Sequence, residues 1–192
     1  MTAKPRARLE AGFFDDLYTA DPDPWGFATS PYEAGKYART LAALEGRRFG
    51  RVLEVGCSIG VFTRMLAPAC DELLGIDVSE RALGLARERL GDLPHVRVER
   101  RGLPEEMPSG PWELVVCSEV LYYLTPADLD DALDAIERGL ASGAMLLAVH
   151  WRPETNLYPL LGDEVHDRLR ARLGPPAYAE STPDYRLERF DR

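Results

Sequence analysis

Short hydrophobic runs alternate along this chain with amphipathic segments of helical spacing. Runs of apolar residues predict buried strands at 51–55, 72–77, 112–118 and 144–150, and strict alternation predicts a further strand at 95–100. Strands that alternate with helices form parallel sheets with both faces covered. The pattern therefore predicts an α/β fold.

The segments between these strands carry helix signals. Pro31 begins one helix, Ser79 caps a second, and Thr125 begins a third that Gly143 is expected to end. Further helices are expected at 61–67 and 163–173. Each helix has an apolar stripe with which to cover the sheet.

Both ends of the chain depart from the alternation. The first dozen residues are polar and are expected to be frayed, and the aromatic, proline-rich stretch 13–27 is interpreted as an ordered loop. Near the C-terminus, AYAEST and YRLERF flank a turn, which predicts a pair of antiparallel edge strands.

Composition narrows the classes of partner. The 192 residues include 23 Lys+Arg and 32 Asp+Glu, a net charge of −9, which suits one domain and disfavours nucleic acid and anionic membranes as partners. No zinc-like spacing and no cysteine framework is found, so no metal is expected and the cytoplasm is the expected location. The expected state is a monomer or homodimer that acts on a small molecule.

A glycine-containing loop after the first buried strand carries the chemistry. Gly56 and Gly60 allow a sharp turn and close ligand approach, and the helix behind them offers free N–H groups. Asp77 ends the next strand, where an acid accepts hydrogen bonds from both hydroxyls of a ribose. Ligands of open α/β sheets bind beyond these strand ends.

The spacing discriminates among three nucleotide-like ligands. The loop has no lysine for a P-loop and has G-x-x-x-G instead of the G-x-G-x-x-G of dinucleotide sites. Glu54, two residues ahead of the first glycine, suits a ligand with an ammonium group. S-adenosyl-L-methionine carries that group, a carboxylate, a sulfonium and a ribose diol.

These residues resemble the class I S-adenosylmethionine-dependent methyltransferases. LEVGCSIG and LLGIDVS are similar to the first two motifs of that class, and LVVCSEVLYYL and ASGAMLLAVHW to later ones. The N-terminal DPDPWGFATSPYEAGKYARTLAAL, with CSIGVFT and SEVLYYL, resembles the NodS-like branch, named for a methyltransferase that acts on the free amine of a chitooligosaccharide.

The resemblance implies a fold and a division of the chain. It implies a single Rossmann-like methyltransferase domain with a mainly parallel central sheet, helices on both faces, a C-terminal antiparallel edge and an N-terminal helical lid. Residues 1–45 are expected to form the lid segment and its helix, and residues 46–192 the methyltransferase core.

Two departures from the family pattern bear on the cofactor. Ser58 stands where the first motif usually has its middle glycine, and its hydroxyl could donate to the cofactor's carboxylate. The acid that usually holds the adenine amino group is missing from the third motif. Adenine is therefore expected between backbone groups near Gly102 and the apolar side chains of Val78 and Leu103.

The candidate site residues fall into three groups, each with a structural alternative. Cofactor contacts are expected from Trp25, Glu54, Gly56, Cys57, Ser58, Gly60, Asp77, Val78, Gly102, Leu103 and Ser118. Substrate contacts are expected from Tyr32, Lys36, Tyr122, Tyr123, Trp151 and His166. Catalysis is assigned to His150 as a general base and to Glu119, which is expected to hold an acceptor amine or to assist proton loss.

The structural alternatives are plain. Cys57 also suits a small core filler, Trp25 a loop anchor, and the tyrosines wall residues, while Glu119 also suits a helix-start acid and a lone histidine is usually structural.

The predicted function is transfer of a methyl group from S-adenosyl-L-methionine to nitrogen or oxygen of a small molecule, leaving S-adenosyl-L-homocysteine. Candidate acceptors are an aminosugar, a sugar or a natural-product intermediate. The alternatives are a non-catalytic S-adenosylmethionine-binding module and a nucleotide-linked oxidoreductase, which the glycine spacing disfavours.

Overall fold

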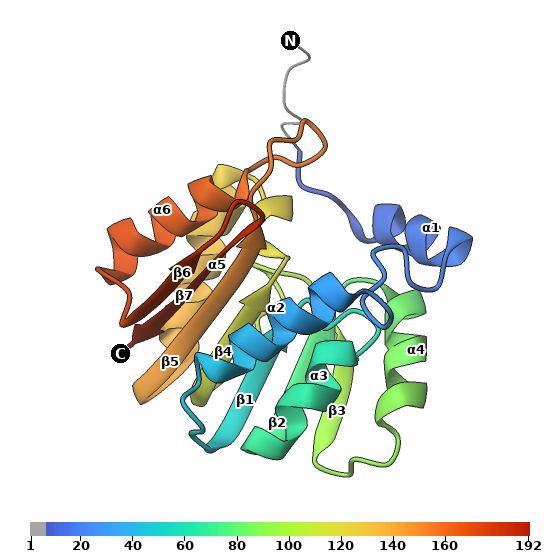
Figure 1. Ribbon diagram of the computed structural model, residues 1–192, viewed down its shortest axis with the longest axis horizontal. Helices are drawn as coiled ribbons and strands as arrows, with labels where there is room; N and C mark the ends of the chain where they lie inside the picture. The colour runs from blue at the N-terminus through green and yellow to red at the C-terminus, as the bar shows by residue number, and fades with distance from the viewer. Residues whose placement is uncertain (1–6) are drawn as a thin grey trace. The chain divides into compact units, whose positions relative to one another are not determined.

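The computed structural model describes residues 7–192, which form two compact units, Glu10–Gly102 and Leu103–Arg192 with Leu9 and the residues before it. The expected fraying of the first six residues lies outside the described part of the chain. Each unit contains parallel strands joined by helices, and the second unit also has antiparallel strands (Figure 1).

The unit Glu10–Gly102 holds three parallel strands in the order β3-β2-β1. Helices α3 and α4 contact these strands. In chain order its elements are α1 (Ala11–Ala20), α2 (Pro31–Ala42), β1 (Phe49–Val55), α3 (Val61–Leu66), η1 (Ala67–Ala69), β2 (Cys70–Asp77), α4 (Glu80–Leu90) and β3 (Val96–Arg100).

Local sequence explains the helix starts of this unit. The Ser30 hydroxyl accepts a hydrogen bond from the Glu33 amide and Pro31 follows it, so α2 begins with a capped first turn. The Ser79 hydroxyl caps α4 by accepting from the Ala82 amide. In the parallel register Val55 lies opposite Ile76, so β1 and β2 end together and present their next residues at one edge.

The second unit holds strands in the order β4-β5-β7-β6. β4 and β5 are parallel, whereas β7 pairs antiparallel with both β5 and β6. Its elements are β4 (Trp112–Ser118), η2 (Leu121–Tyr123), α5 (Pro126–Gly139), β5 (Leu140–Trp151), α6 (Gly162–Leu173), β6 (Tyr178–Ser181) and β7 (Tyr185–Asp191). The predicted antiparallel pair is thus confirmed.

Two local predictions are wrong. The stretch 13–27 is not all loop, because α1 occupies Ala11–Ala20; Phe14 and Tyr18, one helical turn apart, are its buried residues, and the two prolines that suggested a loop follow the helix. Helix α5 ends at Gly139 instead of Gly143, which lies inside β5 with a φ of 75°.

The last residue of α5 packs closely against the segment before β4. A Cβ atom on Gly139 would lie 3.2 Å from Cδ1 of Trp112, and one on Gly110 would lie 2.0 Å from the Gly139 carbonyl oxygen. Only glycine permits this approach of α5 to the segment before β4, and the chain turns into β5 directly after it.

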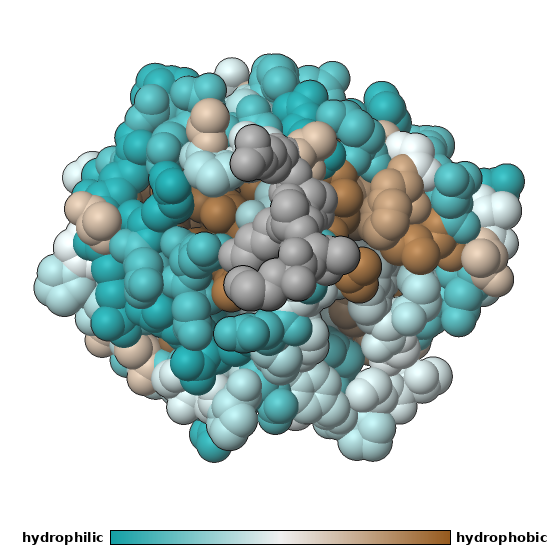
Figure 2. Space-filling view, turned by 90° about the horizontal axis from the view of Figure 1, so that it is seen from above, coloured by the Kyte–Doolittle hydropathy of each residue, from teal (hydrophilic) through white to brown (hydrophobic). Residues whose placement is uncertain are grey.

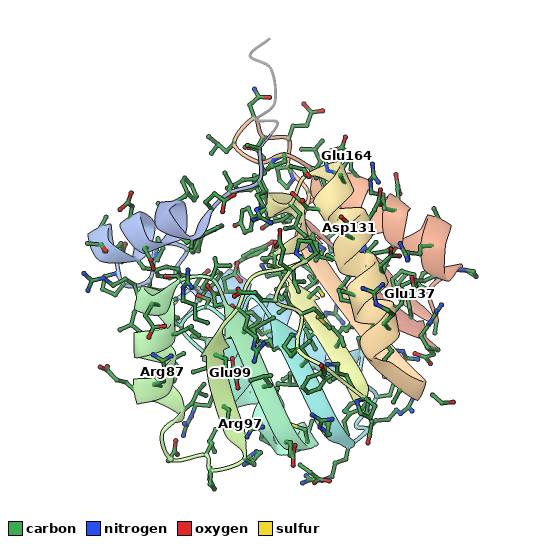
Figure 3. The ribbon with its side chains drawn as sticks, turned by 180° about the vertical axis from the view of Figure 1, so that it is seen from behind. Arg87, Arg97, Glu99, Asp131, Glu137 and Glu164 are labelled. Carbon is green, nitrogen blue, oxygen red and sulfur yellow. The ribbon has the colours of Figure 1, made fainter. Side chains whose placement is uncertain are left out.

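Charged side chains line the outer elements of both units. Figure 3 labels Arg97 and Glu99 on β3, Arg87 on α4 and Glu137 on α5. Arg87 pairs with Glu80 on the same helix at 2.5 Å, and Glu137 receives the C-terminal Arg192 at 2.7 Å. Exposed pairs of this kind contribute little to stability and mark a solvated surface. Within residues 7–192 no helix is long and apolar enough to cross a membrane.

Candidate active site

The loop after β1 has the backbone form that the glycines predict. Gly56 and Gly60 both have a φ of 75°, and the amides of Gly56 and Cys57 donate to the Ile76 carbonyl oxygen. A Cβ atom on Gly60 would lie 3.0 Å from Cδ1 of Leu90. Gly60 therefore allows both the left-handed turn and the approach of α3 to α4.

Asp77 holds this loop in place. One carboxylate oxygen accepts a hydrogen bond from the Ser58 amide at 2.9 Å and the other accepts from the Ser79 amide at 2.9 Å. Burial raises the pKa of the carboxyl, and the backbone amides, that of Val78 included, oppose the rise. Ser58 itself has a φ of 50°, so the residue that replaces the usual glycine keeps the left-handed backbone of a glycine.

Glu54 is an acid inside the protein. Its side chain is buried at the end of β1, and its Oε2 atom has no hydrogen-bond partner. Burial raises the pKa of this carboxyl to about 8, with a further rise from the nearby Asp77 charge, while the Thr63 hydroxyl opposes the rise. A buried acceptor without a donor fits the ammonium group for which the sequence selected this residue.

The raised pKa of Glu54 predicts a pH-dependent stability. Between pH 4.5 and about 8 the folded chain keeps a proton on Glu54 that the unfolded chain has lost, so the free energy of unfolding falls as the pH rises through this window. Glu54→Gln keeps the shape of the neutral acid and removes the titration. We expect the difference in unfolding free energy, variant minus wild type, to grow from pH 5 to pH 8 in urea titrations.

A difference that stays constant with pH would contradict the proton on Glu54. Glu72→Gln is the matched control, because Glu72 is an exposed acid on the neighbouring strand β2. Its difference from wild type is expected to be the same at pH 5 and pH 8.

Cys57, in the loop after β1, packs against strand β2. It is buried, and a Cβ atom on Gly75 would lie 2.9 Å from the Cys57 Cβ atom. Burial and the Asp77 and Glu54 charges raise the pKa of the thiol well above its usual value. The thiol is therefore protonated, which agrees with its interpretation as a small filler and leaves only the backbone of Cys57 for ligand contact.

Two side chains of α1 that the sequence did not single out attach this helix to the glycine loop and to the first turn of α4. The Tyr18 and Ser58 hydroxyls form a short hydrogen bond, and Asp15 accepts from the Ser79 hydroxyl at 2.6 Å. Trp25 packs its ring against Tyr18 with centroids 5.6 Å apart, so only the Tyr18 side chain separates Trp25 from the loop.

Hydrophobic residues also reach the surface over α1, where Phe13 is 43% exposed (right side of Figure 2).

Lys36 and Tyr32, predicted to contact substrate, lie together on α2. The Lys36 ammonium is buried beside the Glu33 carboxylate at 3.0 Å and lies 5.3 Å from the centroid of the Tyr32 ring. Tyr32 is 40% exposed. This ion pair explains structurally why a lysine is buried at position 36. The expected contact of Lys36 with substrate stays a prediction.

Glu119 is held firmly directly after β4. Its backbone has a φ of 53°, and its amide donates to the Val149 carbonyl oxygen. Its Oε2 atom accepts hydrogen bonds from the Tyr122 hydroxyl at 2.7 Å and from the Trp151 amide at 2.8 Å. Ser118 is half-buried at the end of the same strand. The structure thus brings Glu119, the Tyr122 hydroxyl and the Trp151 amide together, and the expected roles of these residues with the acceptor stay predictions.

Tyr122 and Tyr123 form an aromatic cluster with Tyr158, which sequence reasoning missed. The Tyr122 and Tyr158 rings stack with centroids 5.0 Å apart, and Tyr123 meets both rings edge-on. Burial raises the pKa of both Tyr122 and Tyr123 well above the usual value, so the two phenols are neutral. Tyr158 lies in an irregular loop whose sequence has no helical or strand period.

His150 and His166 are completely buried and contact each other, with His150 Nδ1 3.2 Å from His166 Nε2. His150 Nε2 accepts a hydrogen bond from the Leu121 amide, so the lone pair needed by a general base is occupied. The catalytic role of His150 and the substrate role of His166 stay predictions.

The expected adenine contacts fall in different units. Val78 and Gly102 belong to Glu10–Gly102, and the Arg101 amide beside Gly102 donates to the Asp77 carbonyl oxygen at 3.0 Å. Leu103 belongs to the other unit, where it is buried. These three roles also stay predictions.

The glycine loop alone is compatible with several classes of ligand-binding protein, and comparison with known families decides among them. Residues 15–154 match the family described as Nodulation protein S (NodS). The chain belongs to the NodS family. The match includes the glycine loop, Asp77, Glu119 and His150.

Two relatives show how far the likeness extends. Nodulation protein S from Bradyrhizobium diazoefficiens is 39% identical over 105 residues, which are 53% of this chain and 49% of that protein. The Rhizobium tropici protein of the same name is 34% identical over 130 residues, 67% of this chain and 55% of that one. The chain thus spans about half the length of the curated NodS proteins that it matches.

A solved NodS structure confirms the fold class. The N-methyltransferase NodS from Bradyrhizobium japonicum WM9, in complex with S-adenosyl-L-homocysteine, superposes with a TM-score of 0.84 at 27% identity and covers 95% of this chain and 98% of that one. The expected Rossmann-like methyltransferase fold and NodS-like branch are therefore confirmed, and the expected cofactor product is the ligand of this NodS relative. The boundary between residues 45 and 46 stays a prediction.

Proposed function

We propose that this NodS-family chain is an S-adenosyl-L-methionine-dependent methyltransferase that methylates the amine of a small molecule. The observation that carries the proposal is the buried Glu54 carboxyl, whose Oε2 atom has no partner beside a glycine loop ordered by Asp77. Family membership and the NodS structure with S-adenosyl-L-homocysteine support it.

Residues of Glu10–Gly102 bind the donor. Glu54 accepts from its ammonium group, and Asp77 receives its ribose hydroxyls. When bound, S-adenosyl-L-methionine supplies a methyl group that its sulfonium already activates. The protein then has only to position the acceptor, exclude water and remove one proton.

Residues of the second unit receive the acceptor. Glu119 offers a carboxylate that the Trp151 amide and the Tyr122 hydroxyl hold in one orientation. This carboxylate pairs with a protonated amine and takes up the proton that the nitrogen must lose before its lone pair attacks the methyl group. Neutral tyrosines beside it attract a cationic group through their ring faces.

O-methylation is the second candidate, favoured by one comparison. The ubiquinone biosynthesis O-methyltransferase of Bordetella bronchiseptica is 30% identical over 150 residues, 76% of this chain and 60% of that protein. A hydroxyl acceptor needs a stronger base than an amine does, and His150 Nε2 is occupied by the Leu121 amide. The geometry therefore favours the amine.

Transfer of labelled methyl groups tests the proposal. The protein is incubated with methyl-labelled S-adenosyl-L-methionine and a matched panel of aminosugars, their N-acetylated forms, and phenols. We expect label in the free aminosugars and none in the N-acetylated forms, because the acetyl carbonyl delocalises the nitrogen lone pair and the nitrogen is no longer a nucleophile. Label in phenols alone would favour the second candidate, and tight S-adenosyl-L-homocysteine binding without transfer to any of them would contradict the proposal.

A further inference from the structure

A chain of buried hydrogen bonds joins β7 to the turn η2 in the second unit. His166 Nδ1 lies 2.9 Å from Glu188 Oε2, His166 Nε2 lies 3.2 Å from His150 Nδ1, and His150 Nε2 lies 3.3 Å from the Leu121 amide. The side chains of His150, His166 and Glu188 are all completely buried. We call this chain the histidine relay.

The two ends of the histidine relay fix where its protons lie. The Leu121 amide can only donate, so His150 Nε2 is an acceptor and the His150 proton is on Nδ1. At the other end Glu188 is ionised, because hydrogen bonds from His166, Arg170 and Arg186 outweigh its burial and lower its pKa to about 2. A carboxylate accepts, so His166 carries its proton on Nδ1 and offers Nε2 to His150.

Two arginines fix the direction in which the hydrogen bonds of the histidine relay donate. Glu188 Oε1 accepts from Nε of Arg170 and from Nε of Arg186, both at 2.8 Å, which leaves Oε2 for His166. Burial lowers the pKa of His166, which favours its neutral form. Every donor in the chain therefore meets an acceptor, and both histidines are neutral.

The relay ends on the turn that carries the acceptor-site tyrosines. Leu121 begins η2, and the next residue, Tyr122, donates its hydroxyl to Glu119 and packs edge-on against the His150 ring, with centroids 5.3 Å apart. The amide of Leu121 is anchored by a side chain instead of by a backbone carbonyl. The orientation of η2 thus depends on which nitrogen of His150 is protonated.

We propose that Glu188 is a positioning residue for the acceptor site: it sets the tautomers of His166 and His150 so that His150 anchors η2 and fixes Tyr122 against Glu119. This inference rests on the proposed function for its effect on methyl transfer. The tautomers themselves are independent of that function.

Wild-type protein gives the first test. Long-range ¹H–¹⁵N spectra distinguish the two neutral tautomers of histidine, and the chain has three histidines. We expect His150 and His166 to be protonated on Nδ1 at neutral pH. His95 is the internal control, because its Nε2 faces the Ala67 carbonyl oxygen at 3.1 Å and must carry the proton; His95→Gln assigns its signals. A proton on Nε2 of His150 would overturn the proposal.

Glu188→Gln gives the second test. The glutamine oxygen is held by the two arginines, so its NH₂ group faces His166 Nδ1 and both histidine protons move to Nε2. His150 then points a donor at the Leu121 amide. We expect the changed tautomers in the spectra and about a tenfold loss in kcat/KM for the acceptor, with an unchanged Kd for S-adenosyl-L-homocysteine.

The outcomes distinguish a failure of the histidine relay from a failure of the proposed methyltransferase function. Unchanged tautomers in a folded Glu188→Gln variant, or changed tautomers with unchanged kcat/KM, would overturn the positioning role. If wild-type protein transfers no methyl group, the proposed function fails, and the wild-type tautomers still decide whether the relay exists. Glu180→Gln, on the neighbouring strand β6, is the matched control and is expected to leave the histidine spectra unchanged.

Discussion

Asp77→Ala is expected to weaken S-adenosyl-L-homocysteine binding about a hundredfold. Two hydrogen bonds from ribose hydroxyls to a carboxylate contribute roughly 1.5 kcal/mol each, and 1.4 kcal/mol corresponds to a tenfold change in Kd. Asp77 stands at the end of β2 with its carboxylate already directed by the Ser58 and Ser79 amides, so no reorganisation is needed on binding. Calorimetric titration of both proteins gives the two Kd values.

A ligand analogue separates ribose contact from loop order, because Asp77 also holds the loop. In wild-type protein the 2′,3′-dideoxy analogue of S-adenosyl-L-homocysteine is expected to bind about a hundredfold more weakly than the parent, and in Asp77→Ala about equally. If the variant keeps the hundredfold ratio, Asp77 orders the loop but does not contact the ribose. Asp71→Ala, an exposed acid at the opposite end of β2, is the control and should bind both ligands as wild type does.

The strands and helices that have a clear periodic pattern of hydrophobic residues could be predicted from the sequence. Apolar runs predicted β1, β2, β4 and β5, because buried parallel strands leave a clear signal in sequence, and strict alternation predicted the half-exposed edge strand β3. Asp77 and Glu119 were found for a related reason: each follows such a run, at the end of a parallel strand.

Long-range polar contacts were not predictable from one sequence. Tyr18 and Ser58 are 40 residues apart in the sequence, and Glu188 and His166 are 22 apart. No local spacing therefore predicts either pair. The stretch around Tyr18 has a further feature: Pro22 and Pro24, which favour a loop, lie directly after the end of helix α1. A helical spacing of Phe14 and Tyr18 was the signal available.

Glu119→Gln is expected to lower kcat/KM for an amine acceptor about a hundredfold and to leave the Kd for S-adenosyl-L-homocysteine unchanged. Glutamine keeps the size of the side chain and an oxygen for the Trp151 amide and the Tyr122 hydroxyl, so the local structure is retained. What it removes is the charge that pairs with the amine and takes its proton, and loss of a hydrogen-bonded charge partner costs about 2–5 kcal/mol. Single-turnover rates and titrations measure the two quantities.

The way in which Glu119→Gln loses activity also discriminates between roles of the carboxylate. If it mainly holds a protonated amine, KM rises and kcat changes little; if it mainly takes up the proton, kcat falls and the loss diminishes at high pH, where the amine is already neutral. Glu113→Gln, an exposed acid on the same strand β4, should retain wild-type kinetics. Wild-type kinetics in Glu119→Gln would instead leave its carboxylate the purely structural role of joining Trp151 to Tyr122, and the acceptor would then have to be held by other residues.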